Sequence, residues 1–156
     1  MKYVRLLKIA LVLVVCQLPV SAIAQKAELS ASINRRDNAS WQAALKIWEW
    51  AEPGYQETKS SGLLAKILAD AGFRIERGVA DIPTAFTATY GQGQPVIGIL
   101  GEYDALPGLS QQAVPYRQKN TGNLYGQGCG HHLFGVASAS AAIAIAEQIK
   151  AGQLSG

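Results

Sequence analysis

The chain has 156 residues, 49% of them hydrophobic, with 14 Lys and Arg against 11 Asp and Glu. This length suits one compact domain, and we find neither an internal repeat nor a low-complexity segment. Three of the 14 basic residues lie in the first eight positions, so the remainder of the chain carries 11 charges of each sign. It therefore lacks the basic excess expected of a nucleic-acid-binding protein.

Residues 1–24 have the pattern of a signal peptide. A basic start precedes the apolar run 9–15, and the small residues of Ala22-Ile23-Ala24 predict cleavage after position 24. The run is too short to span a bilayer, so we expect no stable membrane anchor and a periplasmic or secreted protein. A retained anchor is one alternative. Lipid attachment at Cys16 is another, although Val15 is bulkier than the residue that usually precedes a lipidated cysteine.

Residues 25–38 are polar and lead into a predicted helix. The side chain of Asn38 or Ser40 is expected to cap it, and Pro53-Gly54 ends it. Its apolar face is predicted from residues at helical spacing: Trp41, Ala44, Leu45 and Trp48. Three tryptophans within ten residues could also form a stacking platform for a sugar or base, but a helix that faces the core explains them more simply.

A second helix is predicted from Thr58 to Ala71, with Gly72 just beyond its end. The residues expected on its buried stripe are Leu63, Leu64, Ile67, Leu68 and Ala71.

Three strands are predicted next, over residues 73–76, 85–90 and 95–100, the last two joined by a turn at 91–94. Because the run 96–100 is apolar on both faces, we expect a central strand covered by helices on both sides. A polar loop over the site at 110–125 and a long helix from His132 or Leu133 to Ala151 complete the pattern. The fold class predicted is α/β, a three-layer mixed sheet flanked by helices.

The sequence Gly126-Gln127-Gly128-Cys129-Gly130-His131-His132 contains both histidines of the chain. With the predicted signal peptide removed, Cys129 is the only cysteine, which excludes an intramolecular disulfide. Gly130 allows a turn tight enough for Cys129 and His131 to face one ion, with His132 pointing elsewhere. Thiolate and imidazole both suit zinc, and less selectively nickel, cobalt or manganese.

Glu102 and Asp104 follow the predicted central strand, at the end of a strand where sites gather in α/β sheets. Either carboxylate could complete a metal site or orient a liganding imidazole. Local pattern alone leaves other interpretations open. The glycines could form a solvated turn, or Cys129 and a histidine could form the dyad of a thiol hydrolase.

Two ordered motifs carry a family resemblance. Glu102-Tyr103-Asp104-Ala105-Leu106-Pro107-Gly108, followed by Gly128-Cys129-Gly130-His131-His132-Leu133-Phe134-Gly135, resembles the co-catalytic metallo-aminoacylase and carboxypeptidase superfamily. The branch most similar is that of amidohydrolases related to aminobenzoyl-glutamate hydrolase. The resemblance implies that residues 25–156 are the N-terminal part of a co-catalytic metallopeptidase catalytic domain.

The resemblance also implies an activity: hydrolysis of a small N-acyl amino acid or peptide-like substrate by a water bound to a divalent metal, zinc or manganese. Cys129 and His131 match the metal ligands of the family. Asp104 matches the carboxylate that supports the site, and Glu102 is a possible outer-shell residue. His132 stands where relatives often have Asp or Asn and is given no role. Gln127 also departs from the pattern, because close relatives usually have His there.

The resemblance further implies that paired glutamates, later histidine ligands and a lid domain would follow the last predicted helix. We therefore expect a truncated catalytic domain with two ligands and no general base. The alternative is a non-catalytic periplasmic metal-binding or interaction domain.

Overall fold

The computed structural model describes residues 25–155, so the predicted signal peptide lies outside the described residues. The chain divides into two compact units, one ending at Arg35 and one beginning at Arg36. Within the first unit, residues 25–35 are helical. Everything below concerns the second unit.

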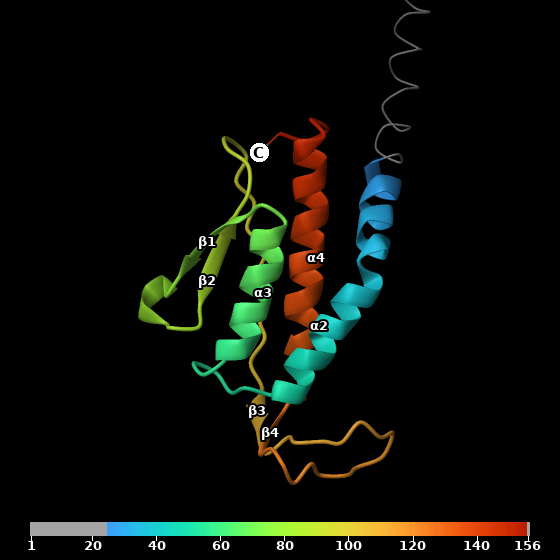
Figure 1. Cartoon of the computed structure of the whole chain (residues 1–156), viewed down its shortest axis with the longest axis vertical. Coiled ribbons are helices and arrows are strands. Elements are labelled where there is room, and N and C mark those ends of the chain that lie inside the picture. The colour runs from blue at the N-terminus through green and yellow to red at the C-terminus, as the bar shows by residue number, and fades with distance from the viewer. Residues whose placement is uncertain (1–24, 156) are drawn as a thin grey trace, which may run out of the picture. The chain divides into compact units, whose positions relative to one another are not determined.

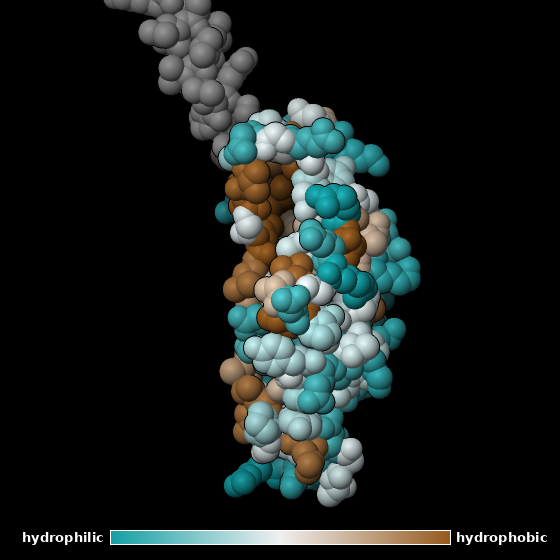
Figure 2. All heavy atoms as spheres, turned by 90° about the vertical axis from the view of Figure 1, so that its left-hand side faces the viewer, coloured by the Kyte–Doolittle hydropathy of each residue, from teal (hydrophilic) through white to brown (hydrophobic). Residues whose placement is uncertain are grey.

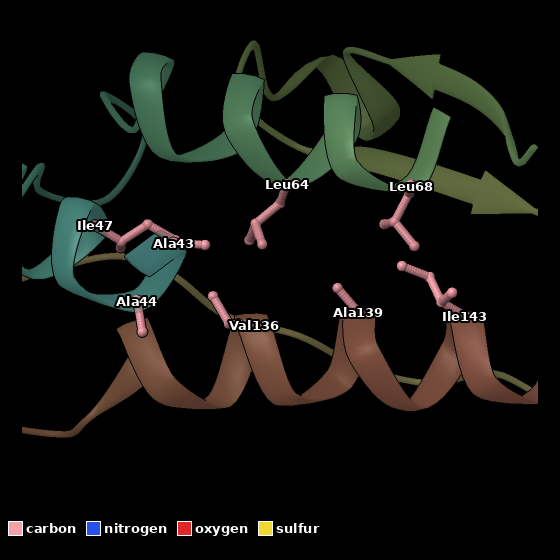
Figure 3. Packing of buried hydrophobic residues seen from close by; sticks show 8 residues of the cluster. All are labelled: Ala43, Ala44, Ile47, Leu64, Leu68, Val136, Ala139 and Ile143. Carbon is pink, nitrogen blue, oxygen red and sulfur yellow. The ribbon is translucent and has the colours of Figure 1, made fainter. Parts of the chain in front are cut away.

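Three helices build the core of this unit (Figure 1): α2 (Asp37–Trp50), α3 (Thr58–Asp70) and α4 (His131–Lys150). Each contributes small or branched apolar side chains that point into the space between the helices (Figure 3). The cluster consists of Ala43, Ala44, Ile47, Leu64, Leu68, Val136, Ala139 and Ile143. Alanines on both α2 and α4 let these two helices approach closely.

The predicted helix α2 is confirmed, but its predicted cap and part of its predicted face are wrong. The helix begins at Asp37 with Arg36 at the N-cap position, so neither Asn38 nor Ser40 caps it. Its buried residues are Ala43, Ala44 and Ile47, whereas Trp41 is 52% exposed. The close α2–α4 contact selects small side chains, and the bulkier indole is left at the surface.

Helix α3 agrees with its prediction over Thr58–Asp70, and Gly72 follows it with a φ of 94°. A carboxylate from outside the helix caps its start. Glu52 accepts hydrogen bonds from the backbone N–H groups of Lys59 and Ser60, at 2.9 and 2.8 Å, and from the Ser60 hydroxyl at 2.7 Å. These donors would otherwise be unpaired in the first turn.

Two of the three predicted strands are confirmed within a residue at each end. β1 (Arg74–Arg77) pairs antiparallel with β2 (Phe86–Thr89), with Ile75 opposite Ala88. A 3-10 turn, η1 (Val79–Asp81), lies between them. A second antiparallel pair, β3 (Leu106–Pro107) with β4 (Tyr125–Gly126), was not predicted from the sequence. Helices and small antiparallel sheets confirm a mixed α/β class in this part of the chain.

The prediction of a central strand at 95–100, and with it the three-layer mixed sheet, is wrong for the described residues. No segment among them pairs with 95–100, and Val96 and Ile97 are 78% and 75% exposed. An apolar run indicates what a segment would bury, but a strand forms only where a neighbouring backbone is present to pair with it. Figure 2 shows hydrophobic side chains at the surface along much of one edge of that view.

Helix α4 is long and apolar enough to cross a membrane by length and composition alone. Its apolar composition has another explanation in this fold, because it packs against both α2 and α3. Val136, Ala139 and Ile143 supply its share of the core.

Candidate metal centre

The segment 101–105 runs between the start of α4 and the loop that precedes α3. On one side the N–H of Ala105 donates to the carbonyl of Glu52 at 2.8 Å, and Ala105 forms a parallel bridge with Pro53. On the other side the carbonyl oxygen of Glu102 lies directly against Gly135. A methyl group on residue 135 would overlap that oxygen, so glycine permits the close approach of the segment to the helix.

The first turn of α4 begins at a tight glycine turn. Gly130 occupies the N-cap position with a φ of 80°, and its carbonyl accepts the N–H groups of Leu133 and Phe134. The Gln127 side chain reaches forward and accepts the backbone N–H of His132 at 3.1 Å. This geometry orients His131 toward the segment 101–105.

The structure brings His131, Glu102 and Asp104 together. Nδ1 of His131 lies 2.8 Å from Oδ1 of Asp104, and Nε2 lies 2.8 Å from Oε2 of Glu102. One ligand atom from each of the three residues falls within 4.8 Å of the others. The His131 side chain is only 20% exposed, so the ring is fixed between the two carboxylates.

The ring cannot satisfy both carboxylates in its neutral form, because a neutral imidazole has one N–H donor and one lone pair. Two carboxylate contacts require either a doubly protonated ring or a cation in place of one proton. If Asp104 accepts the Nδ1 proton, the Nε2 lone pair is directed to the side on which Glu102 lies. An imidazole held by Asp104 at one nitrogen, with the other nitrogen beside Glu102, therefore fits a divalent metal ion at Nε2.

Cys129, predicted as a ligand beside His131, is exposed and does not belong to this three-residue group. His132 also lies outside the group. Burial lowers the pKa of the His132 imidazole below its usual value of 6.5, and its Nδ1 has no hydrogen-bond partner among the described residues. The proximity of His131 and Asp104 was thus predicted from the sequence. Glu102 was predicted only as a possible outer-shell residue, whereas in the structure it contacts the His131 ring directly.

The structure also shows a partly buried chain of hydrogen bonds behind the centre that sequence reasoning missed. The Tyr103 hydroxyl donates to the backbone carbonyl of Thr84 at 2.7 Å, and the Thr84 hydroxyl donates to Glu57. Burial of the ring, and next the nearby Glu57 carboxylate, raises the pKa of Tyr103 to about 12. The one signal in the sequence was the position of Tyr103 between two carboxylates, since alternate residues of an extended segment point in opposite directions.

No family model matches the chain. It is, however, 50% identical over 101 residues to one of the subunits of p-aminobenzoyl-glutamate hydrolase from Escherichia coli (strain K12). The predicted resemblance is confirmed. The match covers 64% of this chain and 21% of the relative, so the chain spans about a fifth of the length of the protein it resembles.

Proposed function

We propose that this chain takes part in metal-dependent hydrolysis of the amide bond of a small N-acyl amino acid or peptide-like substrate. The name of the E. coli relative describes a hydrolase of p-aminobenzoyl-glutamate, in which an acyl group is joined to an amino acid. The structural observation that carries the proposal is His131, fixed between Glu102 and Asp104 with one carboxylate at each ring nitrogen.

In this proposal His131 binds the ion, zinc or manganese, with Cys129 as a second ligand by family resemblance. Asp104 accepts the Nδ1 proton, which fixes the tautomer and keeps Nε2 available. Glu102 lies at Nε2 and adds negative charge on the metal side of the ring. The bound metal would lower the pKa of a water molecule and polarise the substrate carbonyl.

Amide hydrolysis at such a centre also needs a general base. The family resemblance assigns this base to paired glutamates rather than to Asp104, which accepts the Nδ1 proton, or to Glu102, which lies at Nε2. We therefore propose that residues outside this group complete the catalytic site. In this proposal residues 25–156 act as one part of a larger catalytic domain. Separately, we propose that residues 1–24 direct export to the periplasm or medium.

Metal titration of the purified chain tests the proposal directly. Zn²⁺ and Mn²⁺ binding is measured by calorimetry for the wild-type chain, for His131→Gln and for His132→Gln. We expect one ion per chain, binding weakened at least tenfold by His131→Gln, and little change with His132→Gln. His132 is the matched control, because it is the adjacent imidazole and lies outside the carboxylate group. Equal affinity of wild type and His131→Gln would overturn the proposed centre.

Hydrolysis of p-aminobenzoyl-glutamate separates the two functions left open by the sequence. A catalytic role predicts turnover that depends on added metal and is lost with His131→Gln, once the residues that supply the base are present. Tight binding of one ion that never supports turnover, even with those residues added, would instead indicate a metal-binding domain without catalysis.

A further inference from the structure

Three consecutive residues of the candidate centre point in two directions. Glu102 and Asp104 both reach His131, while Tyr103 between them reaches Thr84 on the other side of the segment. The Tyr103 ring packs on the apolar core and stacks on Phe86, with ring centroids 6.1 Å apart and planes 19° apart. The carboxylates are thus presented on one face of the segment, while the half-buried tyrosine packs against the core behind the other face.

The acceptor of the Tyr103 hydroxyl is itself firmly placed. Thr84 is buried, and its hydroxyl donates to the buried carboxylate of Glu57, directly before α3. The carbonyl of Thr84 accepts the Tyr103 hydroxyl at 2.7 Å, two residues before β2 begins. The hydrogen bond therefore ties the segment to both α3 and β2.

Apart from the packing of the Glu102 carbonyl against Gly135, the backbone between Glu102 and Asp104 has little other support. Among the residues that the structure describes, no backbone–backbone hydrogen bond involves positions 101–104. The nearest polar supports lie at either end, where Ser138 donates to the carbonyl of Leu100 at 2.6 Å and Ala105 donates to Glu52. Between those supports, Tyr103 is the side chain that links the segment to the core.

We propose that Tyr103 is a positioning residue of the metal centre, whose hydroxyl bond to Thr84 sets Glu102 and Asp104 on the two sides of His131. The inference rests on the proposed function, because the centre it positions is the proposed metal site. Without the hydroxyl bond, the segment 102–104 can shift or rotate. The two carboxylates then reach the imidazole less often in the arrangement that binds an ion.

The test uses Tyr103→Phe, which removes the hydroxyl and keeps the ring. Co²⁺ is the probe, since its visible absorption reports ligand geometry as well as occupancy. We expect about tenfold weaker Co²⁺ binding, within the range found for residues that orient metal ligands, together with an altered absorption band. Tyr90→Phe is the matched control, because it makes the same chemical change in a ring that packs at a tilt against Phe73. It should keep the affinity and spectrum of wild type.

A second variant separates positioning from general stability. Phe86→Leu weakens packing against the Tyr103 ring but keeps the hydroxyl bond to Thr84. We expect it to lower thermal stability at least as much as Tyr103→Phe while changing Co²⁺ affinity less than threefold. Affinity that falls in parallel with stability in both variants would overturn the positioning role, as would wild-type binding and spectrum in Tyr103→Phe. Failure of the wild-type chain to bind any of the metals would overturn the proposed function itself.

Discussion

The carbonyl oxygen of Glu102 occupies the space that a β-carbon on Gly135 would need, so the segment bearing both site carboxylates packs on α4 without an intervening side chain. The Leu64 side chain approaches the same point from α3. Contact at this position joins the centre to the helical core.

Gly135→Ala is therefore expected to destabilise the protein. Alanine favours a helix over glycine by about 0.5–1 kcal/mol. The added methyl group would nevertheless overlap the Glu102 carbonyl, and relieving such overpacking typically costs about 1–3 kcal/mol. We expect a net loss in the free energy of unfolding, measured by urea denaturation, and weaker metal binding because Glu102 is displaced.

Gly62→Ala is the control for this prediction. Gly62 also lies within a helix, α3, but a methyl group there would meet nothing within 4 Å. The same substitution should then raise the free energy of unfolding by about 0.5–1 kcal/mol. A stabilising Gly135→Ala would show that the close approach to Glu102 is not required.

The start of α3 depends on a carboxylate five residues before the N-cap position. Glu52→Ala removes the acceptor for three donors of Lys59 and Ser60. Losing a helix cap costs about 0.5–2 kcal/mol, and we expect this variant near the upper end because three hydrogen bonds are lost. Urea denaturation measures the loss. Glu49→Ala removes an exposed carboxylate from the end of α2 and should change stability by less than 0.5 kcal/mol, on the order expected for surface substitutions.

Tyr103 is expected to ionise at a higher pH than an ordinary tyrosine, because burial raises its pKa from 10.0 to about 12. The folded protein then retains the phenol proton more tightly than the unfolded chain does. The resulting stabilisation is fully present below pH 10 and is lost as the pH rises toward about 12.

Ultraviolet titration of tyrosinate absorption checks this prediction. In the wild-type chain, part of the absorption change should occur near pH 12, and this high-pH step should be missing in Tyr103→Phe and retained in Tyr90→Phe. If Tyr103→Phe leaves the high-pH step in place, the assignment of that pKa to Tyr103 is wrong.

The spacing of apolar residues in the sequence was sufficient to predict helices and their ends, because these depend on residues close together in the chain. Leu64 and Leu68 lie one turn apart on α3, and Gly72 adopts the positive φ expected just past the helix end. On α2 the same reasoning selected Trp41 for the core, where the structure places Ala43 and Ile47. Spacing shows that a helix has an apolar face, but the partner helix decides how large the side chains on that face can be.

Contacts that join distant segments could not be predicted in this way. The run at 96–100 indicated a strand, but no property of the run itself shows whether a neighbouring strand is present. At the centre, residue types pointed to His131 and Asp104, whose contact spans 27 residues of sequence. The bond from Tyr103 to Thr84 involves a backbone carbonyl, which every residue has, so no sequence pattern could identify it.

Cys129 provides the remaining prediction, because the structure leaves its thiol exposed one residue before the glycine that caps α4. If Cys129 binds the ion beside His131, saturating Zn²⁺ should slow its reaction with an alkylating reagent at least tenfold, since a metal-bound thiolate is a poorer nucleophile. A chelator should restore the original rate. The reaction is followed by mass spectrometry of the peptide that contains Cys129.

In His131→Gln the protection by Zn²⁺ should be lost at the same metal concentration, because the second ligand is missing. A wild-type rate that Zn²⁺ does not change, under conditions where calorimetry shows the site filled, would mean that the ion binds through His131 and the carboxylates without the thiol.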